Sequence, residues 1–340
     1  MNSGLARGLS QTAARPLRVG TTRAPGPIPL LRHFFIEIPA GVWFTVPVIR
    51  MNSPTPICPP NKPTAGERAA LVNLLTDDDP AVYLTVQKKI LSCGPEASEW
   101  LRPHVLSANP VLRRRSREIV RHFAQADADT RFRAFCQQPG EDFDLEAGVW
   151  LLAQTNYPDI NVEAYQAMLD GYAGELRERL DPSADGQKTL EAINNYLFSE
   201  LGFAGNEVAY YDPQNSYLNR VMDRRTGNPI TLSLLYILLA QRLWLPVSGI
   251  GLPGHFICRY KSVTEELYLD AFNRGKTMTR ADCVQFLAHL TEEARAEALA
   301  PASPRRTLGR ICNNLHQIYR QLGLQEETLR INRYAAALAR

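Results

Sequence analysis

The fold is decided by one apolar stretch near the middle of the chain, GNPITLSLLYILLA at residues 227–240. Asn228 is a typical helix N-cap and Pro229 a typical first helical residue, so a helix is predicted to begin here. Leucine and isoleucine residues cover every side of that helix, which is typical of a helix buried nearly all round. The segment is therefore predicted to form the centre of the core.

Two β-strands are predicted to follow the buried helix. Apolar and β-branched residues run from 247 to 260 and from 266 to 272, with the polar turn 261–264 between them, and this pattern favours a hairpin. His255 lies on the first arm and Asp270 on the second. Opposite residues of paired strands lie about 5 Å apart, so the imidazole and the carboxylate are expected to share a hydrogen bond if the register matches.

Helices are predicted on both sides of this segment. Two similar helical runs start with Asp79-Pro80 and Asn109-Pro110, and they resemble HEAT-like helical hairpins. The end of the chain predicts another helical hairpin, broken at Gly323 and similar to a tetratricopeptide unit. The predicted class is α+β, mostly helical, with a buried helix on a small antiparallel sheet and helical repeats as flanks. The predicted divisions are a tail (1–63), HEAT-like hairpins (64–137), the core (138–300) and the tetratricopeptide-like hairpin (301–340).

Composition gives no sign of a nucleic-acid, metal or cofactor partner. The 38 basic and 35 acidic side chains give a net charge of +3, which is too balanced to imply an electrostatic partner. The densest basic run, 113–117 with Arg121, is expected to be a solvated helix face. Six cysteines and six histidines are scattered, without the spacing of a metal site or a disulfide framework. No metal and no cofactor are predicted, and a reducing, cytoplasmic setting fits best.

The first fifty residues differ from the rest of the chain. They are rich in Arg, Pro and Gly, and Glu37 is their only acidic residue. We expect a disordered tail, or an overextended choice of start ahead of Met51, rather than a targeting peptide. The apolar stretch 34–49 contains Glu37 and two prolines, and it is shorter than the roughly 20 residues of a spanning helix. No membrane segment is predicted.

Several motifs between residues 144 and 322 resemble a known family. They are LGFAGN (201–206), YDP (211–213), NSYL (215–218), RRTGNPI (224–230), LPGHF (252–256), DAFN (270–273) and RICNNL (310–315). In this order, and over about half of the chain, they resemble the SirB-type transglutaminase-like family, whose core domain is also found in an animal F-box protein. The resemblance implies a central helix packed on an antiparallel sheet, with His and Asp presented from adjacent strands.

Active relatives of that superfamily carry a Cys at the start of the central helix, where the helix dipole and a neighbouring His favour the thiolate. The corresponding position in this chain falls at or beside Pro229, and no Cys lies between Cys136 and Cys258. Because side chains alternate along a strand, Cys258 is expected to point away from His255. Thr231 is the hydroxyl on this helix that remains as a candidate nucleophile, although an alkoxide needs a stronger base than a thiolate does.

The resemblance therefore implies a site whose chemistry is in question. The candidate catalytic residues, active or vestigial, are His255, Asp270 and Thr231. The candidate binding residues are Asn215, Ser216, Tyr217, Arg224, Arg225, Pro229 and Phe256. Structural roles are open for the same side chains, because Asn and Ser are typical of turns and caps, and the two arginines are typical of solvated surface as well as of an anion site.

Three functions are compatible with these residues. The leading hypothesis is a catalytically silent transglutaminase-like protein that binds a protein or peptide partner in the former active-site cleft, with no nucleic-acid, membrane or metal partner. The alternative is a cysteine-independent hydrolase or acyltransferase, in which His255 and Asp270 act with Thr231 or with water. A scaffold that uses the helical flanks alone is the third.

Overall fold

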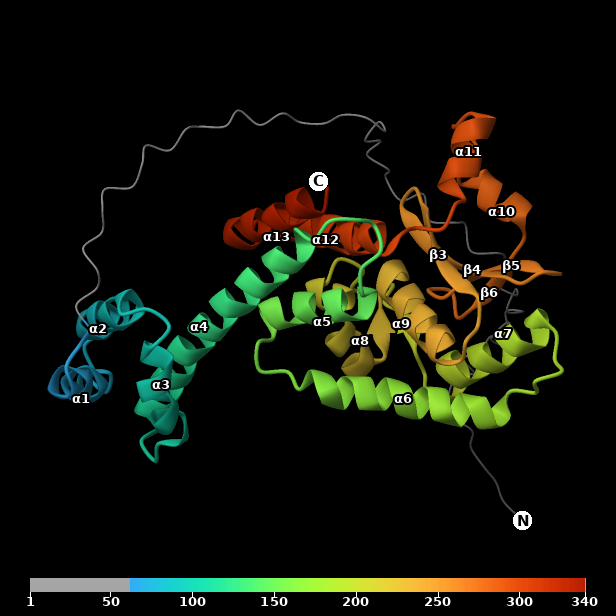
Figure 1. The fold of residues 1–340 in the computed structure, drawn as a ribbon. Coiled ribbons are helices and arrows are strands. Elements are labelled where there is room, and N and C mark those ends of the chain that lie inside the picture. The colour runs from blue at the N-terminus through green and yellow to red at the C-terminus, as the bar shows by residue number, and fades with distance from the viewer. Residues whose placement is uncertain (1–61, 340) are drawn as a thin grey trace, which may run out of the picture. The chain divides into compact units, whose positions relative to one another are not determined.

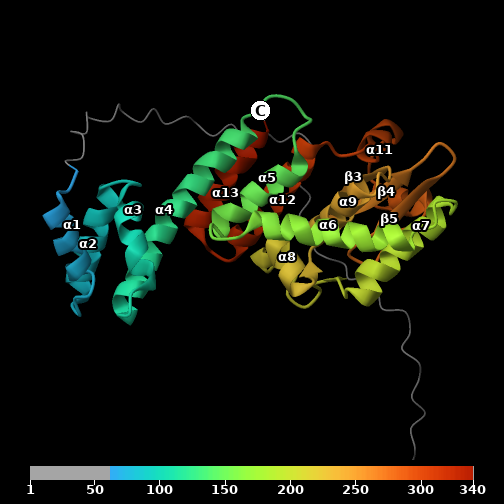
Figure 2. The same ribbon diagram turned by 60° about the horizontal axis from the view of Figure 1, so that its bottom comes forward.

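The computed structural model describes residues 62–339. The predicted fold class is confirmed, because helices dominate and the strands form two small sheets (Figure 1, Figure 2). The predicted tail 1–63 lies outside the described residues except for its last two positions. The helices are α1 (Ala65–Leu74), α2 (Pro80–Ser92), α3 (Ala97–Leu101), α4 (Pro110–Cys136), α5 (Leu145–Asn156), α6 (Val162–Arg179), α7 (Gly186–Asn194), α8 (Leu218–Arg224), α9 (Pro229–Arg242), α10 (Arg280–Gln285), α11 (Glu292–Ala298), α12 (Pro304–Gln321) and α13 (Gln325–Leu338). The strands are β1 (Ala204–Gly205), β2 (Thr226–Gly227), β3 (Val247–Leu252), β4 (His255–Lys261), β5 (Glu266–Asp270) and β6 (Lys276–Met278).

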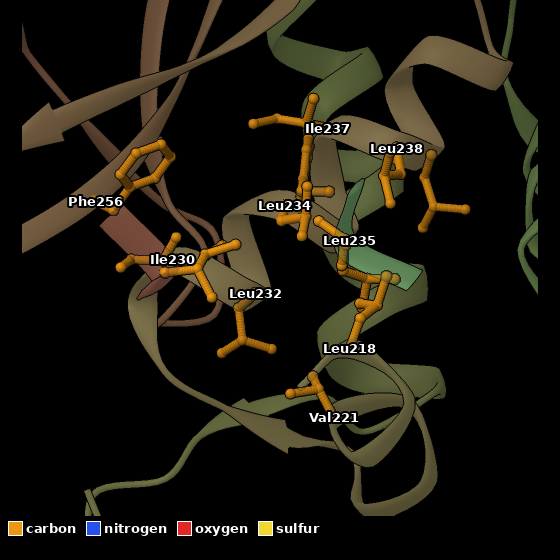
Figure 3. Packing of buried hydrophobic residues seen from close by; sticks show 14 of the residues in the cluster. Leu218, Val221, Ile230, Leu232, Leu234, Leu235, Ile237, Leu238 and Phe256 are labelled. Carbon is orange, nitrogen blue, oxygen red and sulfur yellow. The ribbon is translucent and has the colours of Figure 1, made fainter. Parts of the chain in front are cut away.

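Helix α9 lies inside the main core, as the sequence predicts. Asn228 caps it by accepting a hydrogen bond from a backbone N–H of the first turn, and Pro229 is its first residue. Every residue from Pro229 to Ala240 is buried. Figure 3 shows its apolar side chains spreading between Phe256 of β4 and Leu218 of α8. Each buried Leu or Ile side chain contributes about 1.5–3 kcal/mol to folding, so this helix is a major source of stability.

The strands after α9 form a four-stranded antiparallel sheet in the order β3-β4-β5-β6. The run 247–260, predicted as one strand, is two strands that pair with each other from Val247–Tyr260 to Leu252–His255. The turn between them is Pro253-Gly254, and Gly254 has a φ of +67°, in agreement with Pro and Gly at the central positions of a type II turn. The predicted hairpin is therefore the middle of a longer meander.

The two faces of this sheet are covered by different helices. Phe256 and Cys258 belong to the main core around α9. Their neighbour Ile257 faces the other way, into a second cluster with Cys283 and Leu287. That second face is covered by α10 and α11, two short helices that the sequence analysis did not predict. Because side chains alternate along a strand, His255 and Asp270 are both presented on the α10 side.

Helices α1–α3 and the first half of α4 share a hydrophobic cluster of their own, and the 3₁₀ helix η1 (Arg102–Leu106) follows α3. The predicted caps are confirmed, since Asp79 and Asn109 cap α2 and α4 with Pro at the first position. The later part of α4 contributes Phe132 and Phe135 to the main core, so this one helix belongs to both clusters. The resemblance of this region to HEAT repeats stays a prediction.

The predicted C-terminal hairpin is also part of the main core. Helices α12 and α13 are joined at Gly323, whose φ is +70°, and α12 packs on α9 and α5. Arg305 near the start of α12 donates hydrogen bonds to backbone carbonyls of Cys136 and Gly140. The hairpin therefore packs on α9, and its resemblance to a tetratricopeptide unit stays a prediction. No helix within residues 62–339 has both the length and the apolar character needed to cross a bilayer.

Candidate functional site

His255 and Asp270 form the hydrogen-bonded pair that the sequence suggested, with 2.7 Å between Nε2 of the ring and Oδ2 of the carboxylate. The geometry of the pair differs from the expected one. Strands β4 and β5 pair Cys258 with Leu269, which places His255 diagonally across from Asp270 rather than opposite it. Diagonal neighbours on one face are still within reach of a long side chain, so the pair forms without direct opposition.

The carboxylate of Asp270 is held by the turn that follows it. Its Oδ1 accepts hydrogen bonds from the backbone N–H groups of Phe272 and Asn273, and its Oδ2 accepts a further bond of 2.7 Å from Asn273 Nδ2. Burial raises the pKa of Asp270, but the hydrogen bonds from His255 and Asn273 outweigh burial and leave the pKa below its ordinary value. Asp270 is therefore an ionised, fixed acceptor that orients the imidazole.

Asn273 was not among the predicted site residues, although it stands inside the DAFN motif. An amide three residues after a carboxylate, just past a strand, is a pattern in which a turn brings the two side chains together. This spacing could have identified Asn273.

His255 is part of a row of aromatic side chains. Its ring stacks on Phe286 with 5.9 Å between centroids and an interplanar angle of 11°, and it meets Phe272 edge-on. Phe272 contacts the ring of Tyr210, which contacts Tyr211. Phe286 is 38% exposed and Tyr211 is 52% exposed. The aromatic row, defined as Tyr211, Tyr210, Phe272, His255 and Phe286, thus has solvent-exposed rings at both ends.

The start of α9 is a sealed polar network. The Thr231 hydroxyl lies 2.5 Å from the backbone oxygen of Asn215 and 2.6 Å from Oδ1 of Asn228, and the Thr231 residue is fully buried. Asn228 Nδ2 and Asn314 Nδ2 both donate to Ser216 Oγ. These contacts join the segment before α8, the cap of α9 and helix α12.

Thr231 and His255 are therefore not brought together. Within residues 62–339 no hydrogen bond joins the Thr231 hydroxyl to the imidazole, and the hydroxyl bonds to the α9 network instead. A nucleophile has to be accessible to substrate as well as to its base. The buried Thr231 hydroxyl is accessible to neither, because it is already hydrogen-bonded to Asn215 and Asn228.

The predicted binding residues around α9 lie in the core. Asn215 is fully buried and its Nδ2 donates to the backbone oxygens of Ala209 and Tyr210. Tyr217 is 1% exposed and its hydroxyl lies 3.0 Å from that of Tyr319. Pro229 and Phe256 are also buried. None of these positions presents a side chain to solvent in this structure.

The two arginines before α9 are bound to protein groups rather than solvated. Arg224 forms an ion pair of 2.8 Å with Asp212. Arg225 has a φ of 56°, donates to the backbone oxygen of Leu201, and lies over the ring of Phe203. Arg224 is thus paired with a carboxylate, and the guanidinium group of Arg225 contacts a carbonyl oxygen and an aromatic ring.

The two thiols on the strand and helix around the pair are not activated. Cys258 faces α9, where its Sγ lies 3.5 Å from the backbone oxygen of Ser233, and burial raises its pKa to about 12. Cys283 of α10 lies on the same side of the sheet as Asp270 and is fully buried, and burial raises its pKa to about 11. The sequence analysis did not consider Cys283, because its approach to the pair depends on the packing of α10.

No cluster of His, Cys, Asp and Glu side chains with the composition of a metal site occurs in the described part of the chain. The pair itself supplies an imidazole that Asp270 orients. Such a group is suited to accept a proton or to donate a hydrogen bond.

Comparison with known proteins agrees with this architecture. Residues 163–313 match the family model of the transglutaminase-like superfamily. A UPF0162 protein of Xylella fastidiosa is 37% identical over 185 residues, 53% of this chain and 66% of that protein. Human F-box only protein 21 is 28% identical over 244 residues, 62% of this chain and 38% of that protein.

A UPF0162 protein of Pseudomonas aeruginosa is 29% identical over 182 residues, again 66% of its length. The chain thus spans just under two thirds of these bacterial relatives and much less of the F-box protein. No solved structure matches the chain significantly. The family match covers the helix, the sheet and the oriented pair described above, and residues 163–313 are a transglutaminase-like domain.

Proposed function

We propose that this protein is a catalytically silent member of its superfamily that binds a protein or peptide partner at the surface around His255. The sealed start of α9 is the observation that carries the proposal. At the point where a thiol would stand, Pro229 is buried and the neighbouring Thr231 hydroxyl is committed to Asn215 and Asn228. The imidazole is oriented by Asp270, but within residues 62–339 it forms no hydrogen bond with a hydroxyl or thiol that it could activate.

The aromatic row supports the binding half of the proposal. Tyr and Phe rings supply large contact areas at little conformational entropy, and aromatic residues are enriched at the energetic centres of protein interfaces. Tyr211 and Phe286 are exposed at the two ends of the row. The oriented imidazole between them offers a hydrogen bond of fixed direction. A peptide backbone lying across the row would meet apolar contacts on both sides and one polar contact in the middle.

The surface around the row is held rigidly. Arg310 of α12 donates hydrogen bonds to the backbone oxygens of Leu252 and His255, and thereby fixes the turn that carries the imidazole. Burial lowers the pKa of Arg310. A pre-organised surface loses less conformational entropy when a partner binds, which favours recognition.

A turnover assay tests catalytic silence. Purified protein would be incubated with fluorogenic amide and ester substrates and with a glutamine donor plus an amine acceptor. We expect the same background rate for the wild type, His255→Ala and Cys283→Ala. Turnover that disappears in His255→Ala, while the variant keeps its thermal unfolding temperature, would show that the site reacts. Loss in Cys283→Ala as well would identify the thiol of α10 as the nucleophile.

A binding experiment tests the surface. Peptides would be selected from a random phage-displayed library against the full chain, and their affinities measured by isothermal titration calorimetry. Tyr211→Ala and Phe286→Ala are each expected to weaken binding by roughly tenfold, the effect typical of an aromatic anchor. Trp244→Ala is the matched control, because Trp244 is 91% exposed and lies in the loop after α9. Equal affinities for all three variants and the wild type would place the partner elsewhere.

A hydrolase that uses water is the second candidate, and the fixed geometry of the pair favours it. Asp270 is held by three hydrogen bonds from the following turn and orients the imidazole as a general base is oriented in acyl-transfer enzymes. This reading predicts an activity that Asp270→Asn abolishes and Thr231→Val leaves intact. An activity unaffected by Asp270→Asn would remove this candidate.

A further inference from the structure

A groove outside the transglutaminase-like domain carries a stripe of positive charge. It has a volume of about 880 Å³ and is lined by residues of α2, η1 and one face of α4, together with Asp159. Arg114, Arg117 and Arg121 of α4 line it. Their spacing of three and four residues puts all three side chains on the same face of the helix.

The arginines of the groove differ from their neighbours on α4 in the hydrogen bonds that they make. Arg113 and Arg115 point elsewhere and donate to backbone oxygens of Ser107 and Leu75. Arg114 makes no hydrogen bond or ion pair with any residue between 62 and 339. The predicted basic run therefore lies on two faces of α4. The face that carries Arg114, Arg117 and Arg121 borders the groove.

The other two groove arginines keep most of their donors available. Arg117 donates Nε to the backbone oxygen of Val105, and Arg121 donates one Nη to that of Asn156. Both acceptors are neutral carbonyls, so the guanidinium charges are not paired. Two acidic residues also line the groove, namely Asp159 and Glu118, and Glu118 accepts a hydrogen bond from Tyr83. An anionic ligand would therefore meet three unpaired guanidinium groups.

Apolar side chains complete the groove. Leu91 of α2, Val105 of η1 and Val120 of α4 line it beside the arginines. A ligand that fits has to combine carboxylates with aliphatic side chains. Arg114 and Arg121 are separated by about 10 Å along the helix axis, which is the length of about three residues of an extended peptide. A peptide with acidic residues three positions apart matches this spacing.

We infer that the groove between α2 and α4 binds an extended acidic peptide segment of a partner protein, with Arg114, Arg117 and Arg121 as the residues that hold its carboxylates. Charge complementarity selects the acidic residues, and the aliphatic wall selects the side chains between them. A protein segment fits better than a nucleic acid, because aliphatic side chains alternate with the arginines and His122 is the one ring among the residues that line the cavity, whereas single-stranded nucleic-acid sites stack successive bases on several rings.

Fluorescence anisotropy of the full chain tests the inference. The probe is a fluorescein-labelled peptide of about eight residues with glutamates separated by leucines, and a peptide with lysines in place of the glutamates is the counter-probe. The triple variant Arg114→Gln, Arg117→Gln, Arg121→Gln is expected to weaken binding by on the order of tenfold, the combined effect of three partly exposed charge pairs. Arg114→Glu alone is expected to weaken it as well, and this residue makes no contact whose loss would unfold α4.

A matched control separates the groove from general charge. The triple variant Arg133→Gln, Arg280→Gln, Arg306→Gln removes the same charge from exposed positions outside the groove and is expected to keep the wild-type affinity. Equal weakening in both triple variants, or no binding of the acidic probe to the wild type, would overturn the inference. So would a single-stranded RNA of similar charge that binds more tightly than the peptide and depends on the same arginines.

Discussion

Removing the Asn228 side chain is expected to destabilise the fold more than removing an ordinary helix cap. Asn228 is 3% exposed, and its side chain takes part in three hydrogen bonds, with the backbone N–H of Thr231, the Thr231 hydroxyl and Ser216 Oγ. A capping side chain contributes about 1 kcal/mol. Two further buried hydrogen bonds contribute about 1 kcal/mol each. Asn228→Ala should therefore lower the free energy of unfolding by about 3 kcal/mol.

Urea unfolding followed by circular dichroism measures this difference. Asn161→Ala is the matched control, because Asn161 caps α6 through one hydrogen bond to Ala164 N and is exposed. Its expected effect is about 1 kcal/mol. The slope of the free energy against urea concentration should be the same in all proteins, so that the midpoints report stability directly.

A double-mutant cycle locates the extra stabilisation. Thr231→Val removes the hydroxyl but keeps the shape of the side chain, and it shares the 2.6 Å bond with Asn228. The double variant should therefore lose about 1 kcal/mol less than the sum of the single variants. If Asn228→Ala is no more harmful than Asn161→Ala, or if the two substitutions at the network are additive, the start of α9 is not the sealed network described above.

Three other substitutions test separate parts of the fold by the same unfolding measurement. Asp270→Asn should weaken the dependence of the unfolding free energy on pH in the acid range. A carboxyl whose pKa is lowered on folding stabilises the protein at pH values above its ordinary pKa of 3.8, and this contribution is lost as the pH falls through the folded pKa. Parallel curves of unfolding free energy against pH for variant and wild type would contradict this. Tyr217→Phe leaves the buried Tyr319 hydroxyl without its partner and should destabilise by about 1–2 kcal/mol, while adding Tyr319→Phe should restore part of the loss rather than double it. Gly249→Ala puts a methyl group 2.6 Å from the ring of Phe256 and should destabilise by about 1–3 kcal/mol, so a neutral result would show that the ring moves freely.

Local signals predicted the ends of the helices well. Asp79 and Asn109 were identified as caps because a short polar side chain before Pro satisfies backbone N–H groups whatever the rest of the fold does. Gly323 is predicted from the sequence as a helix end, and it has a positive φ, a conformation that glycine adopts without strain. Such features depend on a few consecutive residues, so the sequence alone contains them.

The turn between β3 and β4 was missed although its signal is local. Pro253-Gly254 is a typical turn dipeptide, but it lies inside a long apolar run that favours one continuous strand. The consequence reaches the site, since this turn positions His255 at the start of β4. The apolar composition of residues 247–260 favours one strand, and this signal outweighed the turn signal of Pro253 and Gly254 in the prediction.

The burial of the predicted binding residues depends on contacts that sequence patterns do not contain. Asn215 and Ser216 lie in a polar segment that is typical of an exposed loop, yet helix α12 covers it and Asn314 donates to Ser216. Nearly a hundred residues separate the partners. A polar residue type predicts a hydrogen bond, but whether the bond is to solvent, to a ligand or to a distant helix is decided by tertiary packing.

The His255–Asp270 pair alone does not separate binding from catalysis. Asp270 also accepts two backbone N–H groups of the turn from β5 to β6, and this contribution to stability explains a fixed carboxylate without any reaction. Tyr211 is 52% exposed and Phe286 is 38% exposed, and the exposed part of each ring contributes nothing to stability, because apolar surface left in water gains nothing on folding. In the function that we propose, a partner would cover these exposed parts, so the aromatic row rather than the pair is the stronger support for that proposal.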